Sequence, residues 1–156
     1  MPRRLLAELK QSKPFPALAD EVYLEIQRTA QVSARWVVEA LKPFNLTPPQ
    51  FNVLRILRGA RPEALKSSAI ADRMVTHDPD LTRLLDRMAA AGLVEKTRDP
   101  VDRRAVSVRI TGAGLRLIGE ASEAVSARMA ETLGALGKQR LNTLADLLEL
   151  VRQSTS

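Results

Sequence analysis

The chain has 156 residues, enough for one domain with a hydrophobic core, and its net charge of +6 favours a polyanionic partner. It contains no cysteine, which excludes disulfides, thiolate metal sites and thiol redox switches. It has no signal peptide and no apolar run of about 18 residues, so we expect a soluble, cytoplasmic protein.

The N-terminal part of the chain predicts one long helix after a short basic segment. Residues 1–16 form either a brief helix that docks on a partner subunit or a frayed terminus. Residues 17–42 carry apolar side chains at helical spacing, and Pro43 ends that helix. The apolar positions are Val22, Ile26, Trp36, Val37 and Leu41.

A second helix is predicted after Pro43. Thr47 suits its N-cap, and Pro48 suits its first turn because the missing N–H costs nothing there. Phe51, Leu54 and Leu57 form its buried stripe, and Gly59 ends it. A short strand near Leu65 could follow and pair with a later hairpin.

Residues 67–93 predict a short helix, a tight turn and a second short helix. Ser67 or Ser68 would cap the first, and His77 or Asp78 followed by Pro79 would begin the second. Gly92 would end it. Its inward face is Leu81, Leu84, Leu85 and Met88. Its outward face is Pro79, Thr82, Arg83, Asp86 and Ala90, with Arg87 on the flank. The pattern fits a helix-turn-helix or a helical hairpin of an ordinary bundle.

After this helix pair, the spacing of apolar residues changes from the helical period to the alternation of a β-strand. Residues 93–98 alternate loosely and residues 104–111 alternate well, and the Asp-Pro of the intervening segment favours a turn. The expected tip of this hairpin carries Arg98, Asp99, Asp102, Arg103 and Arg104. A hairpin directly after such a helix pair is typical of the wing of a winged helix, whose arginines can enter a minor groove. A solvated charged turn is the alternative.

Two helices are predicted at the C-terminus, from Thr111-Gly112 to about Leu133 and over Lys138–Arg152. Gly134–Gly137 separates them. The last helix repeats Leu141, Leu144, Leu148 and Val151 at spacings of three and four, a narrow seam that suits packing across a subunit boundary. Leu147 and Leu150 add further apolar surface. We expect both termini and this helix pair to form a dimer.

The run TRLLDRM…GLVEK (82–96) and the segment DPVDRRAV…ITGAG (99–114) resemble the MarR family of winged-helix transcriptional regulators, and the likeness covers nearly the whole chain. It implies a mainly α fold with a small β-hairpin wing. In this single domain, residues 1–45 and 112–156 would be dimerisation helices, and residues 46–111 the winged-helix DNA-binding region. It further implies a homodimer that binds pseudo-palindromic promoter DNA, usually as a repressor, and is often released by a small ligand or an oxidant.

The predicted helix contacts with DNA are these. Thr82 and Arg83 face the major groove, where Arg83 binds a guanine edge or, failing that, a phosphate. The Asp80 carboxylate either accepts a hydrogen bond from a cytosine amine or interacts only with the helix dipole. Arg87 binds phosphate, or pairs with Asp86 or an upstream acid. Ser67, Ser68 and His77 are further candidates for phosphate contact.

The predicted wing contacts involve Arg98 and the tip. By resemblance to the family, Arg104 enters the minor groove and Asp102 orients its guanidinium by a charge-assisted bond. Arg103 could exchange roles with Arg104. The family's ligand pocket could involve Trp36 and Phe51 here, although both residues could simply be core.

Catalysis is not expected. The chain has one histidine, no cysteine, no glycine-rich phosphate loop and no histidine–carboxylate cluster, so we expect no enzyme, metal or cofactor. The remaining alternative is a winged-helix module that docks on another protein without reading DNA. The salt dependence of the binding affinity distinguishes DNA binding from protein docking, because phosphate contacts release counterions.

Overall fold

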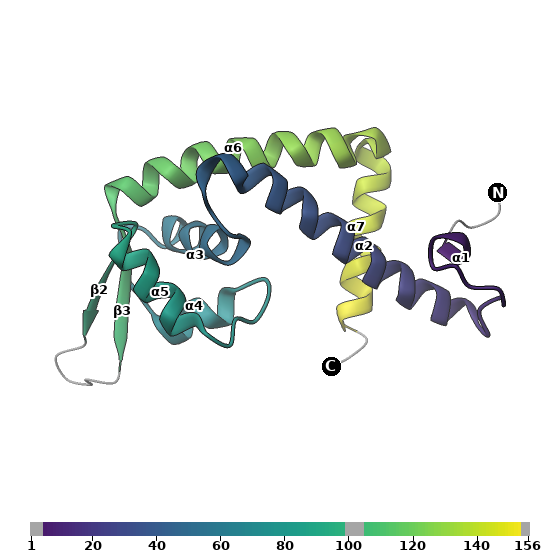
Figure 1. The fold of residues 1–156 in the computed structure, drawn as a ribbon, viewed down its shortest axis with the longest axis horizontal. Helices are drawn as coiled ribbons and strands as arrows, with labels where there is room; N and C mark the ends of the chain where they lie inside the picture. The colour runs from purple at the N-terminus through teal and green to yellow at the C-terminus, as the bar shows by residue number, and fades with distance from the viewer. Residues whose placement is uncertain (1–4, 99–104, 154–156) are drawn as a thin grey trace.

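The computed structural model describes residues 5–98 and 105–153 and is mainly helical, with one small sheet (Figure 1). The helices are α1 (Leu5–Glu8), α2 (Leu18–Leu41), α3 (Pro48–Gly59), α4 (Ser67–Arg73), α5 (Leu81–Ala90), α6 (Gly112–Leu133) and α7 (Gly137–Gln153), with short 3-10 turns η1 (Lys42–Phe44) and η2 (Gly134–Leu136). Strands β1 (Leu65–Lys66), β2 (Val94–Arg98) and β3 (Val106–Ile110) form an antiparallel sheet in the order β1-β3-β2. The predicted fold class is confirmed.

Capping residues explain why several helices begin where the sequence predicts. Thr47 Oγ1 accepts from the Gln50 N–H, and Gln50 Oε1 accepts in return from the Thr47 N–H at 2.9 Å. Thr111 Oγ1 accepts from the Gly114 N–H at 3.0 Å and begins α6. Such caps satisfy amides that have no partner within the helix. The predicted bounds of α2, α3 and α6 are confirmed to within one residue.

Two predicted helix starts are wrong. The N-cap of α4 is Lys66, and Ser67 does not cap the helix, because its hydroxyl donates to the Val106 carbonyl of β3 at 3.1 Å. Helix α5 begins at Leu81, after Asp80, and not at His77 or Asp78. Asp78 Oδ1 accepts from the Asp80 N–H at 2.9 Å, a local bond that holds the chain in a turn instead of a helix.

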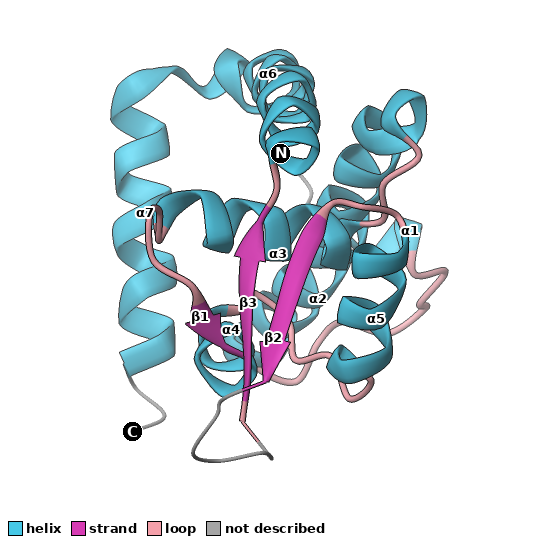
Figure 2. Cartoon of the chain, turned by 90° about the vertical axis from the view of Figure 1, so that its left-hand side faces the viewer, coloured by secondary structure: helices cyan, strands magenta, loops and turns pink. Residues whose placement is uncertain are grey.

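The core lies where α3, α5 and α6 meet the sheet. The apolar stripe predicted for α3 is buried, as are Leu84, Leu85 and Met88 of α5. Val108 of β3 and Ile118 of α6 join the same cluster. Figure 2 shows the sheet with α3 and α4 behind it and α5 alongside β2. This packing fixes the orientation of α5, whose other face is left exposed.

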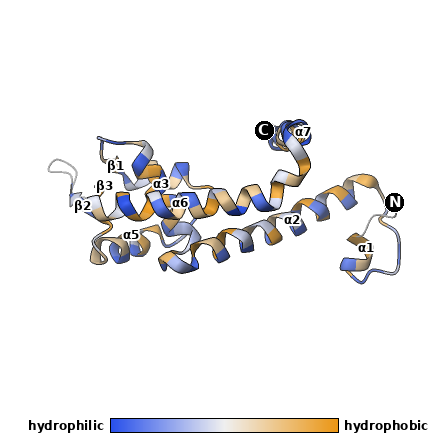
Figure 3. Ribbon diagram, turned by 90° about the horizontal axis from the view of Figure 1, so that it is seen from above, coloured by the Kyte–Doolittle hydropathy of each residue, from blue (hydrophilic) through white to orange (hydrophobic). Residues whose placement is uncertain are grey.

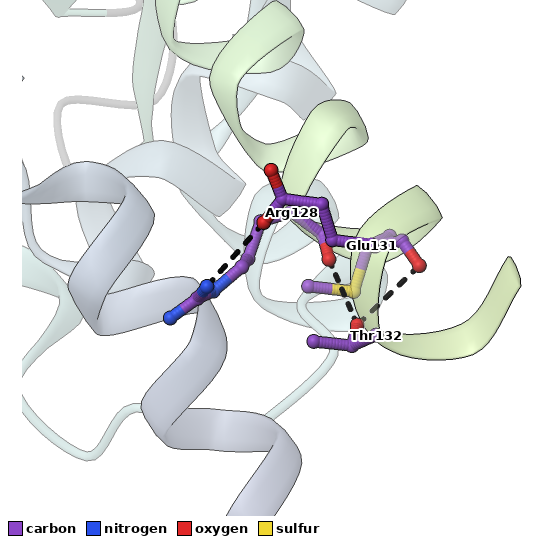
Figure 4. Close-up of polar contacts among 4 residues, drawn as sticks. Arg128, Glu131 and Thr132 are labelled. Carbon is purple, nitrogen blue, oxygen red and sulfur yellow. Dashed lines mark hydrogen bonds and ion pairs between the residues drawn. The ribbon is translucent and has the colours of Figure 1, made fainter. Parts of the chain in front are cut away.

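Side chains near the end of α6 bond to one another and to the helix backbone (Figure 4). The Thr132 hydroxyl donates to the Arg128 carbonyl at 2.8 Å, and Arg128 Nη1 forms an ion pair with Glu131 Oε2 at 3.4 Å. The hydroxyl thus bonds back to a carbonyl one turn earlier that the helix ladder also uses, as threonine commonly does within a helix. Beyond it, η2 turns the chain and leads into α7.

Helix α7 extends away from the rest of the chain. It overlaps α2 in Figure 1 but stands apart from it in the view from above in Figure 3. Every residue of α7 except Leu141 is exposed. Large exposed apolar side chains gather on α7 and on the first half of α2: Leu18, Val22, Tyr23, Leu144, Leu147, Leu148, Leu150 and Val151. A helix with this much exposed apolar surface is typical of one that packs against another chain.

The N-terminal segment forms a brief helix in its described part. Leu5 of α1 is buried, and Glu8 forms an ion pair with Arg28 of α2, with Arg28 Nε and Glu8 Oε2 3.6 Å apart. Helix α1 therefore packs on its own chain; whether it also docks on a partner stays a prediction. Within residues 5–98 and 105–153, no helix has both the length and the apolar character needed to cross a bilayer.

Candidate nucleic-acid interface

Helix α5 presents a polar face to solvent. Thr82, Arg83, Asp86, Arg87 and Ala90 are all exposed, as the spacing predicts, and the Arg83 side chain is 81% exposed. The opposite face is buried against α3, α4 and β2. We call the exposed face, from Thr82 to Ala90, the reading face. A helix held from behind by buried side chains, with a polar face in solvent, is an element that can enter a major groove.

The end of α5 is fixed by a glycine turn, as predicted. Gly92 has a φ of +70°, the left-handed conformation that residues with a Cβ rarely adopt. Its N–H donates to the Ala89 carbonyl at 2.9 Å, and the Leu93 N–H donates to the Met88 carbonyl at 3.0 Å. This pair of bonds is the Schellman motif. It passes the chain directly from α5 into β2.

Asn52 of α3 anchors the turn before α5, a role that the sequence did not predict. Its Oδ1 accepts from the Val75 N–H at 2.8 Å. The only sequence signal is a polar residue between Phe51 and Val53, both of which are buried. The bond joins the turn to the core and so helps to set where α5 begins.

Replacing Asn52 by alanine should lower the free energy of unfolding by about 1 kcal/mol, because the Val75 N–H loses its protein partner. Urea denaturation measures this change. Asn52→Asp is the matched control, since it keeps the accepting oxygen and should lose less. An Asn52→Ala protein as stable as the wild type would contradict the anchoring role.

Two acidic residues on or beside the reading face lie against basic ones. Arg83 Nε and Asp80 Oδ1 are 3.7 Å apart, so Asp80 forms an ion pair with Arg83. Neither of the two roles predicted for Asp80 included this pair. Asp86 pairs with Lys96 of β2, so the predicted pairing of Arg87 with Asp86 is wrong. Within the described residues, no acid forms an ion pair with Arg87, and its phosphate role stays a prediction.

The other predicted phosphate contacts lie near α4 and the turn. Ser68 is exposed in the first turn of α4, and His77 is exposed in the turn before α5. The Ser67 proton is already used by the Val106 carbonyl, which leaves this hydroxyl only as an acceptor and unsuited to donating to phosphate. The Ser67 hydroxyl therefore joins α4 to β3, and a phosphate contact through the Ser67 backbone amide stays a prediction.

The hairpin pairs as its alternation predicts. Val94 pairs with Ile110 and Arg98 with Val106, and Leu65 of β1 pairs with Val108, which confirms the short strand. Arg98 is exposed at the end of β2. The predicted tip residues Asp99, Asp102, Arg103 and Arg104 lie outside the described residues.

Neither predicted ligand residue, Trp36 or Phe51, lines either of two hollows on the described surface. Phe51 is 7% exposed and belongs to the core, and Trp36 is half-buried on α2. One hollow lies on the outer face of the sheet, next to Ser107 and Arg109, and another lies beside Arg28 of α2. In the described part of the chain, no cluster of three or more histidine and acidic side chains could hold a metal ion.

Comparison with known proteins agrees with this geometry. The family model described as "MarR family" matches residues 46–106, the segment from α3 to β3. The multiple antibiotic resistance protein MarR of Escherichia coli is 32% identical over 130 residues, which cover 81% of this chain and 87% of the relative. The chain belongs to the MarR family.

Solved MarR structures share the fold over most of their length. A MarR transcription factor from Planctomyces limnophilus is 39% identical, with a TM-score of 0.68, over 88% of this chain and 99% of that one. A mutant MarR from E. coli, complexed with operator DNA, is 28% identical with a TM-score of 0.74, over 86% and 98%. This chain is therefore a MarR-family transcriptional regulator with a winged-helix fold, and not an enzyme.

Proposed function

We propose that the protein is a homodimeric repressor that binds pseudo-palindromic promoter DNA, with one reading face in the major groove of each half-site. The observation that supports this most is the geometry of α5. Its polar face is exposed, its other face is buried, and the turn at each end is held by hydrogen bonds. The E. coli MarR structure solved with operator DNA supports the same partner.

The wing would add a minor-groove contact. Arg98 is the exposed described residue nearest the tip, and Arg104, oriented by Asp102, is the proposed inserted side chain, with Arg103 as its substitute. The negative potential of a narrow A·T-rich groove favours such an arginine. Unchanged affinity after removal of both Arg103 and Arg104 would contradict this part of the proposal.

The exposed apolar surface of α7 and of the first half of α2 supports the homodimer. A dimer would place two copies of α5 about 34 Å apart, the distance between half-sites one helical turn apart. A small ligand that binds better to a dimer with another spacing would release DNA by a shift of population. Trp36 is the candidate ligand contact, because its side chain is half-buried, whereas Phe51 is part of the core.

Replacing Leu147 by glutamate should convert the dimer to a monomer, because this side chain is 55% exposed in the single chain and would meet apolar side chains of a partner. The fold of the monomer should persist, while DNA affinity falls at least about 100-fold, since one half-site is then bound at a time. Analytical ultracentrifugation measures the change in mass.

Val75→Glu is the matched control for that experiment. Val75 is 79% exposed in the turn before α5, away from α7, so this variant should stay dimeric. A Leu147→Glu protein that keeps the dimer mass would contradict the proposed interface.

Affinity for DNA at several salt concentrations tests the proposal against protein docking. Each phosphate contact steepens the slope of log K against log salt by about 0.9 on duplex DNA. We expect a steep slope that corresponds to several phosphates per dimer. A shallow slope, or no binding of DNA, would favour a winged helix that docks on another protein.

A further inference from the structure

Lys96 and Asp86 form an ion pair between the wing and the reading helix. Lys96 lies in β2 opposite Val108, with its side chain only 22% exposed, and its Nζ donates to Asp86 Oδ1. Asp86 is 60% exposed on the reading face, one helical turn after Thr82. The Lys96 side chain is therefore largely covered where β2 packs against α5, while its ammonium group reaches Asp86 on the reading face.

The pairing changes the charge that the reading face offers to DNA. Arg83 and Lys96 each lie against a carboxylate, of Asp80 and Asp86 respectively. Arg87 is then the one cation of the reading face that forms no ion pair with an acid in the described part of the chain. An ammonium paired with a carboxylate attracts a phosphate much less than a free one, because the two charges oppose each other at nearly the same distance.

We propose that Asp86 withholds the Lys96 ammonium from DNA phosphates and so limits binding that is independent of sequence. This inference rests on the proposed function. Phosphate attraction supplies essentially all of non-specific binding, and a genome offers a vast excess of non-specific sites. An acid on the reading face is then useful, since it leaves the contacts with base edges unchanged while it lowers the attraction to arbitrary DNA.

The test is the affinity of the full-length protein for a random-sequence duplex at several salt concentrations. Asp86→Asn keeps the shape of the side chain and frees Lys96. It should bind the random duplex about fivefold more tightly near 0.1 M salt and should steepen the salt slope by about 0.9 for each added phosphate contact. Asp86→Asn with Lys96→Met should return both the affinity and the slope to wild-type values, because the freed ammonium is gone.

Glu39→Gln is the matched control. The Glu39 carboxylate accepts a hydrogen bond from Lys42 Nζ at 2.8 Å, which together with the charge of Lys42 lowers its pKa. This variant changes the net charge as Asp86→Asn does and also frees a lysine, but at the end of α2 and away from α5. Its affinity and slope should match the wild type.

Four results would overturn the inference. Three of them are an unchanged slope for Asp86→Asn, a gain that persists in the double variant, and a gain of the same size in Glu39→Gln. Loss of operator affinity in Asp86→Asn, with the random duplex unaffected, would also overturn it, because Asp86 would then be reading a base. Wild-type protein that binds no DNA would contradict the proposed function itself. Thermal unfolding of each variant confirms that the fold is retained.

Discussion

Replacing Arg83 by alanine should lower operator affinity by about 100-fold or more, because each bidentate contact with a guanine edge is worth about 1–3 kcal/mol and a dimer has two copies. The side chain is the most suitable one for this contact, since it is 81% exposed on the reading face and its guanidinium lies against Asp80. Discrimination between the operator and single-base variants of it should also fall at the position that Arg83 reads.

Fluorescence anisotropy with labelled operator and with random duplex measures both effects. Arg35→Ala is the control: it removes the same charge from an exposed position on α2, and its effect should be small because a distant charge is screened within about 10 Å. An equal loss on operator and on random DNA for Arg83→Ala would show that Arg83 contacts phosphate and not a base.

Replacing Gly114 by alanine should lower the free energy of unfolding by about 3 kcal/mol, because the added methyl group has no space. A Cβ at this position would lie 2.3 Å from the Leu93 carbonyl oxygen and 2.9 Å from Ile110 Cγ1. The carbonyl belongs to the backbone that joins α5 to β2, and the Thr111 N–H also donates to it at 3.1 Å. The start of α6 would have to move away from the wing.

Gly112→Ala is the matched control, two residues earlier in the same helix. Its Cβ would meet only Arg116 Nη1 at 3.7 Å, an ordinary contact with the end of a long side chain. Urea denaturation of the two variants should therefore separate them clearly. Equal stability of Gly114→Ala and Gly112→Ala would contradict the close approach of α6 to the Leu93 carbonyl.

Elements defined by local chemistry were predictable from the sequence. Thr47 and Thr111 begin α3 and α6 because their hydroxyl groups bond to amides three residues later, and Gly92 ends α5 because it can adopt a positive φ. The apolar spacing of α5 predicted its buried face, and hence the exposure of Arg83. Each of these depends on residues within one or two turns.

Interactions between distant segments were not predictable in this way. Ser67 bonds to Val106 instead of capping α4, and Asn52 bonds to the turn at Val75. Lys96 appears in the sequence as one more basic residue of the hairpin, and only the packing of β2 against α5 brings its ammonium to Asp86. The late start of α5 shows a local competition that the sequence pattern did not resolve, because Asp78 and Pro79 favour a helix start and a turn alike.

Selection of bound fragments from the source genome tests the central claim most directly. If two copies of α5 read DNA as a homodimer, the enriched fragments should share an inverted repeat whose half-sites are about 10 base pairs apart, centre to centre. Enrichment of no sequence, or of a single unrepeated site, would contradict the account of α5 as the reading helix of a symmetric dimer.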